Sequence, residues 1–87
     1  MMLMADVRES IFTDRHRQFR AMLIAERKRA RLTQPELAAK LGRPKSYVAK
    51  IEIGDRRLDV MEYLDLASAL GFDPSRLIRK LRKSPTR

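Results

Sequence analysis

The segment from Thr33 to Gly54 constrains the fold of this 87-residue chain more than any other part of the sequence. Thr33 and Glu36 have the spacing of a capping box, and Pro35 stands in the first turn of the helix that follows, where its missing N–H does little harm. Gly42 comes after one short helical run and suits a sharp turn in which a Cβ atom would be strained. The segment therefore predicts two short helices joined by a tight turn.

The second of these helices is expected over residues 44–53, and Gly54 ends it. Val48 and Ile51 face the first helix, and Ala38 is small enough to let the two helices cross. Two helices joined by a short turn that contains glycine form a helix-turn-helix motif. The outer face of the second helix is narrow and basic, which suits entry into the major groove of DNA. That face carries Lys45, Ser46, Ala49, Lys50 and Ile53.

Apolar residues at helical spacing, together with capping residues, predict three further helices. The first is expected over residues 14–29 with Thr13 as its cap, the fourth over 59–70 with Asp59 and Glu62 at its start, and the fifth over 73–83. No alternating apolar run predicts a strand. The expected fold class is therefore all-α, a five-helix domain that contains the helix-turn-helix motif.

The chain has the length of one domain. We place the helix-turn-helix domain at residues 13–83, an N-terminal arm at residues 1–12 and a basic C-terminal tail at residues 84–87. The N-terminal segment is either an arm or an extra strand or turn that becomes ordered when two chains pair.

The charge balance points to a polyanionic partner. The chain has 20 lysines and arginines against 11 acidic residues, a net charge of +9, and nucleic acid is the first candidate for such an excess. The charge is unevenly placed, because residues 58–74 contain acids and no base, whereas residues 75–87 contain bases and no acid. The acidic band is either a face turned away from the ligand, a face that meets a basic partner surface, or a solvated helix face.

Several classes of protein are excluded by what the sequence lacks. Without cysteine there is no disulfide framework and no thiolate zinc site, and one histidine cannot build an imidazole metal site. No Gly-rich phosphate loop or pair of catalytic carboxylates is visible, so we expect no metal, no cofactor and no enzymatic activity. No apolar run reaches the roughly 20 residues of a membrane-spanning helix, so we expect a cytoplasmic, nucleoid-associated protein.

The sequence resembles the Cro/C1-type (XRE) helix-turn-helix regulators of phages and bacteria. The resemblance covers roughly residues 19–81 and is carried, in order, by RLTQPELAAKLG, SYVAKIEIGDRR and YLDLASALGFDPSRLI. It implies a lambda-repressor-like fold and a sequence-specific regulator, a repressor, that binds a palindromic operator on double-stranded DNA as a homodimer. An antitoxin that also binds a toxin protein, and a restriction–modification controller protein, are the alternatives with this domain.

The resemblance assigns DNA-contact roles to individual positions. Gln34 matches a residue that touches a phosphate while it abuts the recognition helix. The base-reading positions of the family are matched by Lys45, Ser46 and Lys50, and lysine can donate to guanine O6 and N7. Tyr47 matches a position near the sugar-phosphate chain, with a half-buried packing residue as the alternative.

The loop after the recognition helix and two unusual positions complete the expected interface. Arg56 and Arg57 match a loop that contacts the DNA backbone, with solvated loop charge as the alternative. Pro44 stands where the family usually has a Ser or Thr cap, so Arg43 is expected to contact a phosphate in its place. Ile53 stands where the family is usually polar. Both departures leave the half-site sequence open.

Two further sets of residues are expected to have structural roles. Arg27 and Glu52 fall on the inner stripes of their helices, where a charge is costly unless it is paired. The family has an Arg–Glu pair at these two places, so we predict that the two side chains bond. The apolar residues of the last helix complete the core or form a two-fold dimer contact, and the resemblance implies that this helix often does both; these residues are Leu77, Ile78 and Leu81.

Overall fold

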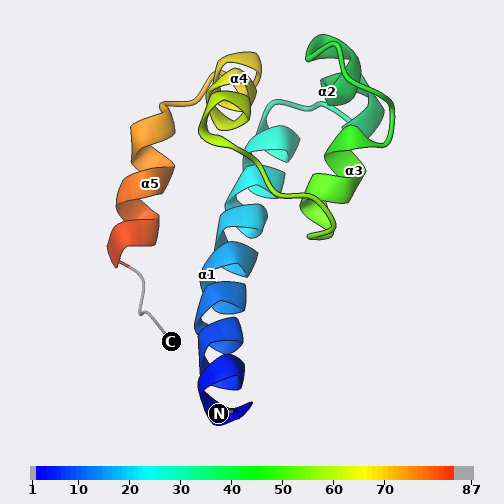
Figure 1. Cartoon of the computed structure of the whole chain (residues 1–87). Coiled ribbons are helices and arrows are strands. Elements are labelled where there is room, and N and C mark those ends of the chain that lie inside the picture. The colour runs from blue at the N-terminus through cyan, green and yellow to red at the C-terminus, as the bar shows by residue number, and fades with distance from the viewer. Residues whose placement is uncertain (1, 84–87) are drawn as a thin grey trace.

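The computed structural model describes residues 2–83, so the predicted basic tail at 84–87 lies outside the described residues, and side chains are described from residue 14 onward. The described chain forms five helices and no strand, which confirms the predicted fold class (Figure 1). The helices are α1 (Met2–Arg29), α2 (Gln34–Lys40), α3 (Tyr47–Glu52), α4 (Val60–Leu70) and α5 (Pro74–Lys83).

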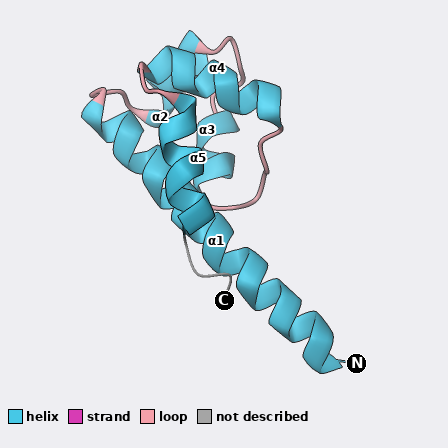
Figure 2. Cartoon of the chain, turned by 90° about the vertical axis from the view of Figure 1, so that its left-hand side faces the viewer, coloured by secondary structure: helices cyan, strands magenta, loops and turns pink. Residues whose placement is uncertain are grey.

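The first helix is longer than the sequence predicted. It begins at Met2, so the expected start at Asp14 is wrong, and Thr13 lies inside the helix instead of capping it. Residues 2–12 contain no proline or glycine, and nothing in their local sequence ends a helix. The N-terminal half of α1 projects beyond the other helices (Figure 2). A role of residues 1–12 in pairing two chains stays a prediction.

Capping boxes begin the second and fourth helices, as the sequence predicted. The Thr33 hydroxyl accepts from the backbone N–H of Glu36 at 3.2 Å, and the Glu36 carboxylate accepts from the N–H of Thr33 at 2.8 Å. Asp59 and Glu62 make the same two contacts at 2.8 and 3.1 Å. Each box satisfies backbone donors that a helix start otherwise leaves open. Gly71 ends α4 in the left-handed conformation, with φ of 78°.

The second helix of the motif, α3, is shorter than predicted. It begins at Tyr47, and the residues before it form a turn in which the Tyr47 N–H donates to the carbonyl of Pro44 at 2.9 Å. The expected start at Pro44 is therefore wrong. Lys45 and Ser46 lie in this connecting turn, directly before α3, instead of in the first helical turn of α3.

The core lies where α1, α4 and α5 meet the helix-turn-helix pair. Ala38 is fully buried, and α2 packs against α3. The small size of Ala38 predicted this close crossing of the two helices. Leu77 is only 1% exposed, so it completes the core of its own chain, which is the first alternative considered for it, and it leaves little surface for a second chain. The buried apolar residues are Leu23, Leu37, Ala38, Tyr47, Val48, Ile51, Tyr63, Leu66, Ala67, Leu70, Phe72 and Leu77.

Candidate nucleic-acid interface

The outer side of the helix-turn-helix pair is exposed and cationic. Lys45 and Ser46 in the turn and Lys50 on α3 are all exposed, and the small side chain of Ala49 between them is half-buried. Ile53, directly after α3, is 66% exposed. The helix α3 has only six residues, and the turn before it contributes two of these exposed side chains. We call these residues the α3 surface: Lys45, Ser46, Ala49, Lys50 and Ile53.

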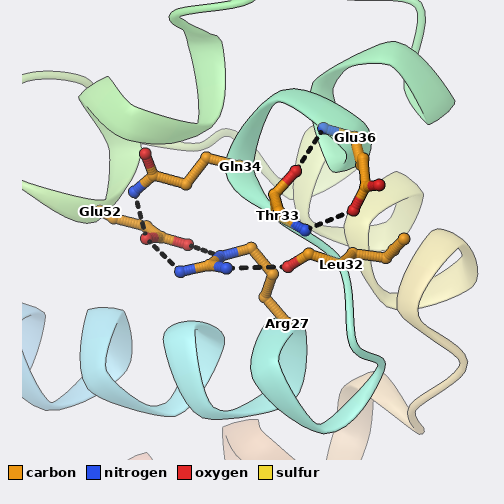
Figure 3. A network of polar contacts seen from close by, with 6 residues as sticks. All are labelled: Arg27, Leu32, Thr33, Gln34, Glu36 and Glu52. Carbon is orange, nitrogen blue, oxygen red and sulfur yellow. Dashed lines mark hydrogen bonds and ion pairs between the residues drawn. The ribbon is translucent and has the colours of Figure 1, made fainter.

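A polar network holds the inner side of α3 (Figure 3). Arg27 donates from Nε to Oε2 of Glu52 at 2.7 Å and from Nη2 to Oε1 at 3.2 Å, which is the predicted pair. Gln34 donates from Nε2 to the same Oε1 at 2.7 Å. The remaining terminal nitrogen of Arg27 donates to the Leu32 carbonyl at 2.8 Å. The network therefore joins α1, the turn after it, α2 and α3.

The burial of this network decides what it contributes. The side chains of Arg27 and Glu52 are only 12% and 7% exposed. A buried ion pair is favourable only when its geometry is good and further hydrogen bonds satisfy the remaining donors and acceptors. The fork-like contact and the bond from Gln34 meet both conditions. The network thus fixes the orientation of α3, and Gln34 abuts the recognition helix as the sequence analysis expected.

A second charged cluster holds the two flanks of α3. Arg56, after the helix, donates from Nη1 and Nη2 to the two carboxylate oxygens of Glu62 at 2.9 and 2.7 Å. Arg43, before the helix, has its Nη2 3.5 Å from Oε2 of the same carboxylate. The guanidinium carbons of Arg43 and Arg56 lie 4.9 and 4.8 Å from the centroid of the Tyr47 ring. These distances are those of cation–π contacts.

Tyr47 is a packing residue. It is 6% exposed, so the packing alternative holds for its ring and little of the side chain is left for the sugar-phosphate chain. Burial, and then the charge of Glu62, raise the pKa of its hydroxyl against the opposing effect of the two arginines. The ring supports Arg43 and Arg56 from below and links them to the core.

Glu62 stays ionised throughout this arrangement. The hydrogen bonds from Arg56 and from the backbone of Asp59 lower its pKa from 4.5 to about 2. From the sequence, Glu62 was predicted only as a capping residue. The signal for its second role was weak, because nothing local tells which arginine an acidic residue will meet.

Comparison with known proteins identifies this arrangement. A family model described as a helix-turn-helix domain matches residues 18–82. The chain is also similar to a solved structure, an XRE-family like protein from Pseudomonas syringae pv. tomato str. DC3000. The two are 43% identical, the TM-score is 0.80, and the match covers 85% of this chain and 90% of that one. No curated protein gives a significant match.

The chain belongs to the XRE family of helix-turn-helix proteins. The XRE family is a DNA-binding, non-enzymatic family. This agrees with the nucleic-acid partner and the lack of enzymatic activity that were expected from the sequence. Within residues 2–83 of this XRE-family chain, every helix is too short or too polar to be a membrane-spanning segment. Among residues 14–83, whose side chains are described, no group of His, Asp and Glu side chains has an arrangement that could hold a metal ion.

The predicted contact residues of the XRE-family domain differ in how much surface they offer. Arg57 is exposed, like the lysines of the α3 surface. Arg43 and Arg56 have side chains that are 39% and 37% exposed, so they face solvent while they bond Glu62. Gln34 is half-buried, with its amide on Glu52. The predicted contact residues therefore fall into two groups. The lysines and arginines keep surface for a ligand, whereas Gln34 and Tyr47 pack inside the protein and support α3 and the arginines beside it.

A buried carboxylate on α1 was missed by the sequence analysis. Glu26 is 7% exposed, forms an ion pair with Arg29 and accepts from Nη2 of Arg76 on α5 at 2.8 Å. Burial alone would raise its pKa, but the hydrogen bonds from the two arginines outweigh that effect and lower it. Its place on the stripe of Leu23 was a signal for burial. Its partner, 50 positions away, left no local signal.

Proposed function

We propose that this XRE-family protein is a sequence-specific, double-stranded DNA-binding regulator of transcription that acts as a repressor. The observation that carries the proposal is the α3 surface, an exposed cationic face held from behind by the Arg27–Glu52–Gln34 network. A short helix with small side chains between two lysines fits the width of the major groove. Lys45, Ser46 and Lys50 are the proposed base-reading residues, with guanine O6 and N7 as the acceptors for lysine.

Contacts to phosphate are proposed for the arginines beside the α3 surface. Arg57 is exposed in the loop after α3, and Arg43 and Arg56 each keep more than a third of the side chain in solvent. Phosphate contacts set the register of the protein on the duplex and carry no sequence information. With a net charge of +9, most of the affinity for DNA should depend on salt concentration. Occupancy next to a promoter would then exclude the polymerase.

A homodimer is the proposed functional unit, and the surface near α5 supports it. Ile78 is half-exposed and Leu81 lies beside it on α5. Both line an apolar hollow of about 280 Å³ between α5, the body of α1 and the start of α4, together with Phe19 and Val60. Exposed apolar surface of this kind marks an interaction site. We propose that two chains pair there and that each α3 surface contacts one of two half-sites about 10 bp apart.

The decisive experiment is selection of bound sequences from a random pool of duplexes, with the stoichiometry of the complex measured by analytical ultracentrifugation. The expected result is a palindromic sequence bound by two chains. Failure to enrich any sequence would contradict sequence-specific binding, and one chain on an undivided site would contradict the homodimer. Copurification of a tightly bound second protein would instead support the antitoxin alternative.

A further inference from the structure

One carboxylate outside the helix-turn-helix motif connects both flanks of the recognition helix. Arg43 precedes α3 and Arg56 follows it, yet both bond Oε2 of Glu62, which lies in the first turn of α4. The ring of Tyr47, the first residue of α3, lies under both guanidinium groups. The two arginines are therefore held in place before any DNA is bound.

Holding an arginine in advance changes what it costs to bind a phosphate. A free arginine side chain loses rotamer entropy when it is fixed on a ligand. Arg56 is already fixed by two bonds to Glu62 and by its contact with Tyr47, and it still has a side chain that is 37% exposed. Part of the entropy lost when this side chain is ordered is therefore lost on folding and not on DNA binding. A guanidinium has five N–H donors, so some of them remain for a phosphate oxygen.

If Glu62 orders the two arginines for phosphate binding, its removal should weaken DNA binding. Simple charge repulsion predicts the opposite effect. Glu62 is ionised and lies beside the proposed DNA surface, so it should repel phosphates, and its removal should tighten DNA binding. Removal should also leave two neighbouring guanidinium groups without their shared counter-charge. Which effect is larger depends on whether the arginines contact DNA in the geometry that Glu62 enforces.

We propose that Glu62 is a positioning residue for DNA binding, which holds Arg43 and Arg56 in the geometry that binds DNA phosphates beside α3. The proposal rests on the proposed DNA-binding function. It makes α4, the helix after the motif, part of the recognition apparatus, although the carboxylate itself does not touch DNA.

The test compares Glu62→Gln with Asp65→Asn. Glutamine is accepted at the third position of a capping box, so the first variant keeps the start of α4 while it removes the charge. Asp65 is exposed on the same helix, and its side chain makes no hydrogen bond or ion pair with the described side chains, so the second variant makes the same charge change away from the cluster. Affinity for the selected duplex and for a random duplex is measured by fluorescence anisotropy at several salt concentrations.

We expect Glu62→Gln to weaken binding to the selected duplex by about tenfold, the scale of one or two charge-assisted hydrogen bonds. Asp65→Asn should leave it equal or slightly tighter. Arg56→Ala should weaken DNA binding when it is made in the wild-type protein. When Glu62→Gln is already present, Arg56→Ala should change the affinity by less than about twofold, because the effects of coupled residues are not additive. The proposal is overturned if Glu62→Gln binds as tightly as Asp65→Asn.

A second variant keeps the test decisive if Glu62→Gln does not fold at the assay temperature, which circular dichroism would show. Arg56→Lys keeps the charge but loses the planar fork that bonds Glu62. Arg56→Lys should weaken binding to the selected duplex nearly as much as Arg56→Ala does. An Arg56→Lys protein that binds this duplex with wild-type affinity would overturn the proposal. Wild-type protein that prefers no duplex would instead overturn the proposed function, so the two failures are distinguishable.

Discussion

Arg27 and Glu52 lie 25 positions apart in the sequence, yet the Nε of the arginine is 2.7 Å from Oε2 of the glutamate. The contact joins the first helix to the recognition helix. Because both side chains are nearly buried, neither charge can lose its partner without a large penalty. The orientation of the α3 surface therefore depends on a bond made inside the protein.

Glu52→Ala should lower the free energy of unfolding by roughly 3–5 kcal/mol, because it leaves the Arg27 guanidinium buried without its carboxylate. Gln34 loses its acceptor at the same time. Urea denaturation followed by circular dichroism measures the change. Asp65→Ala, at an exposed position, is the control and should stay within about 0.5 kcal/mol of wild type. A loss below about 1 kcal/mol for Glu52→Ala would show that the pair is not effectively buried.

Lys50→Ala should reduce the preference for the selected sequence and weaken binding to it by about 1–3 kcal/mol, because a lysine that donates to guanine discriminates between base pairs. Lys45→Ala should act in the same way. The measurement is affinity for the selected duplex against duplexes with each guanine replaced. Lys40→Ala removes the same charge from an exposed site at the end of α2 and should leave the preference intact. Equal weakening on selected and random duplexes would assign Lys50 to phosphates instead.

Arg57→Ala should weaken binding to all duplexes alike. A phosphate contact carries no base information, and its loss should reduce the slope of log K against log salt by about one. Titrations of selected and random DNA over a range of potassium chloride concentrations give this slope. An unchanged slope, or a loss confined to the selected duplex, would contradict a phosphate contact by Arg57.

Ile78→Glu should convert the proposed homodimer to a monomer, because it puts a charge into the apolar hollow between α1 and α5. Sedimentation equilibrium is the measurement. Met61→Glu is the control, since Met61 is 68% exposed and does not line the hollow. A dimer of unchanged affinity in Ile78→Glu would place the dimer contact on another surface.

Stability should fall in acid over a window set by Glu62. Its pKa is lower in the folded protein, about 2, than its ordinary value of 4.5, so the unfolded chain takes up a proton first. The contribution of Glu62 is therefore complete above pH 4.5 and is lost as the pH falls toward 2. Urea midpoints between pH 7 and 2 should drop in this window for the wild type and drop less for Glu62→Gln. Parallel profiles would show that other carboxylates control the acid transition.

Local sequence signals predicted most of the secondary structure. Thr33 and Glu36, and then Asp59 and Glu62, set the starts of α2 and α4, because a capping box uses only residues three apart. Two boundaries were wrong. The first helix continues past Thr13, because residues 2–12 contain no proline or glycine to end it. The residues from Pro44 form a turn before α3 instead of the first turn of that helix.

The five helices and the helix-turn-helix motif could be predicted from the sequence alone, and the Arg27–Glu52 pair from the sequence together with the family resemblance. The burial of Leu77, the bond between Glu26 and Arg76 and the contact of Glu62 with two arginines follow from the packing of the helices. The two groups of features differ in the distance along the chain over which their interactions act. Helix caps and apolar spacing act between near neighbours, whereas an ion pair between helices requires the angles at which those helices pack. In a chain with 20 basic residues, no local pattern specifies which of them will meet a given carboxylate.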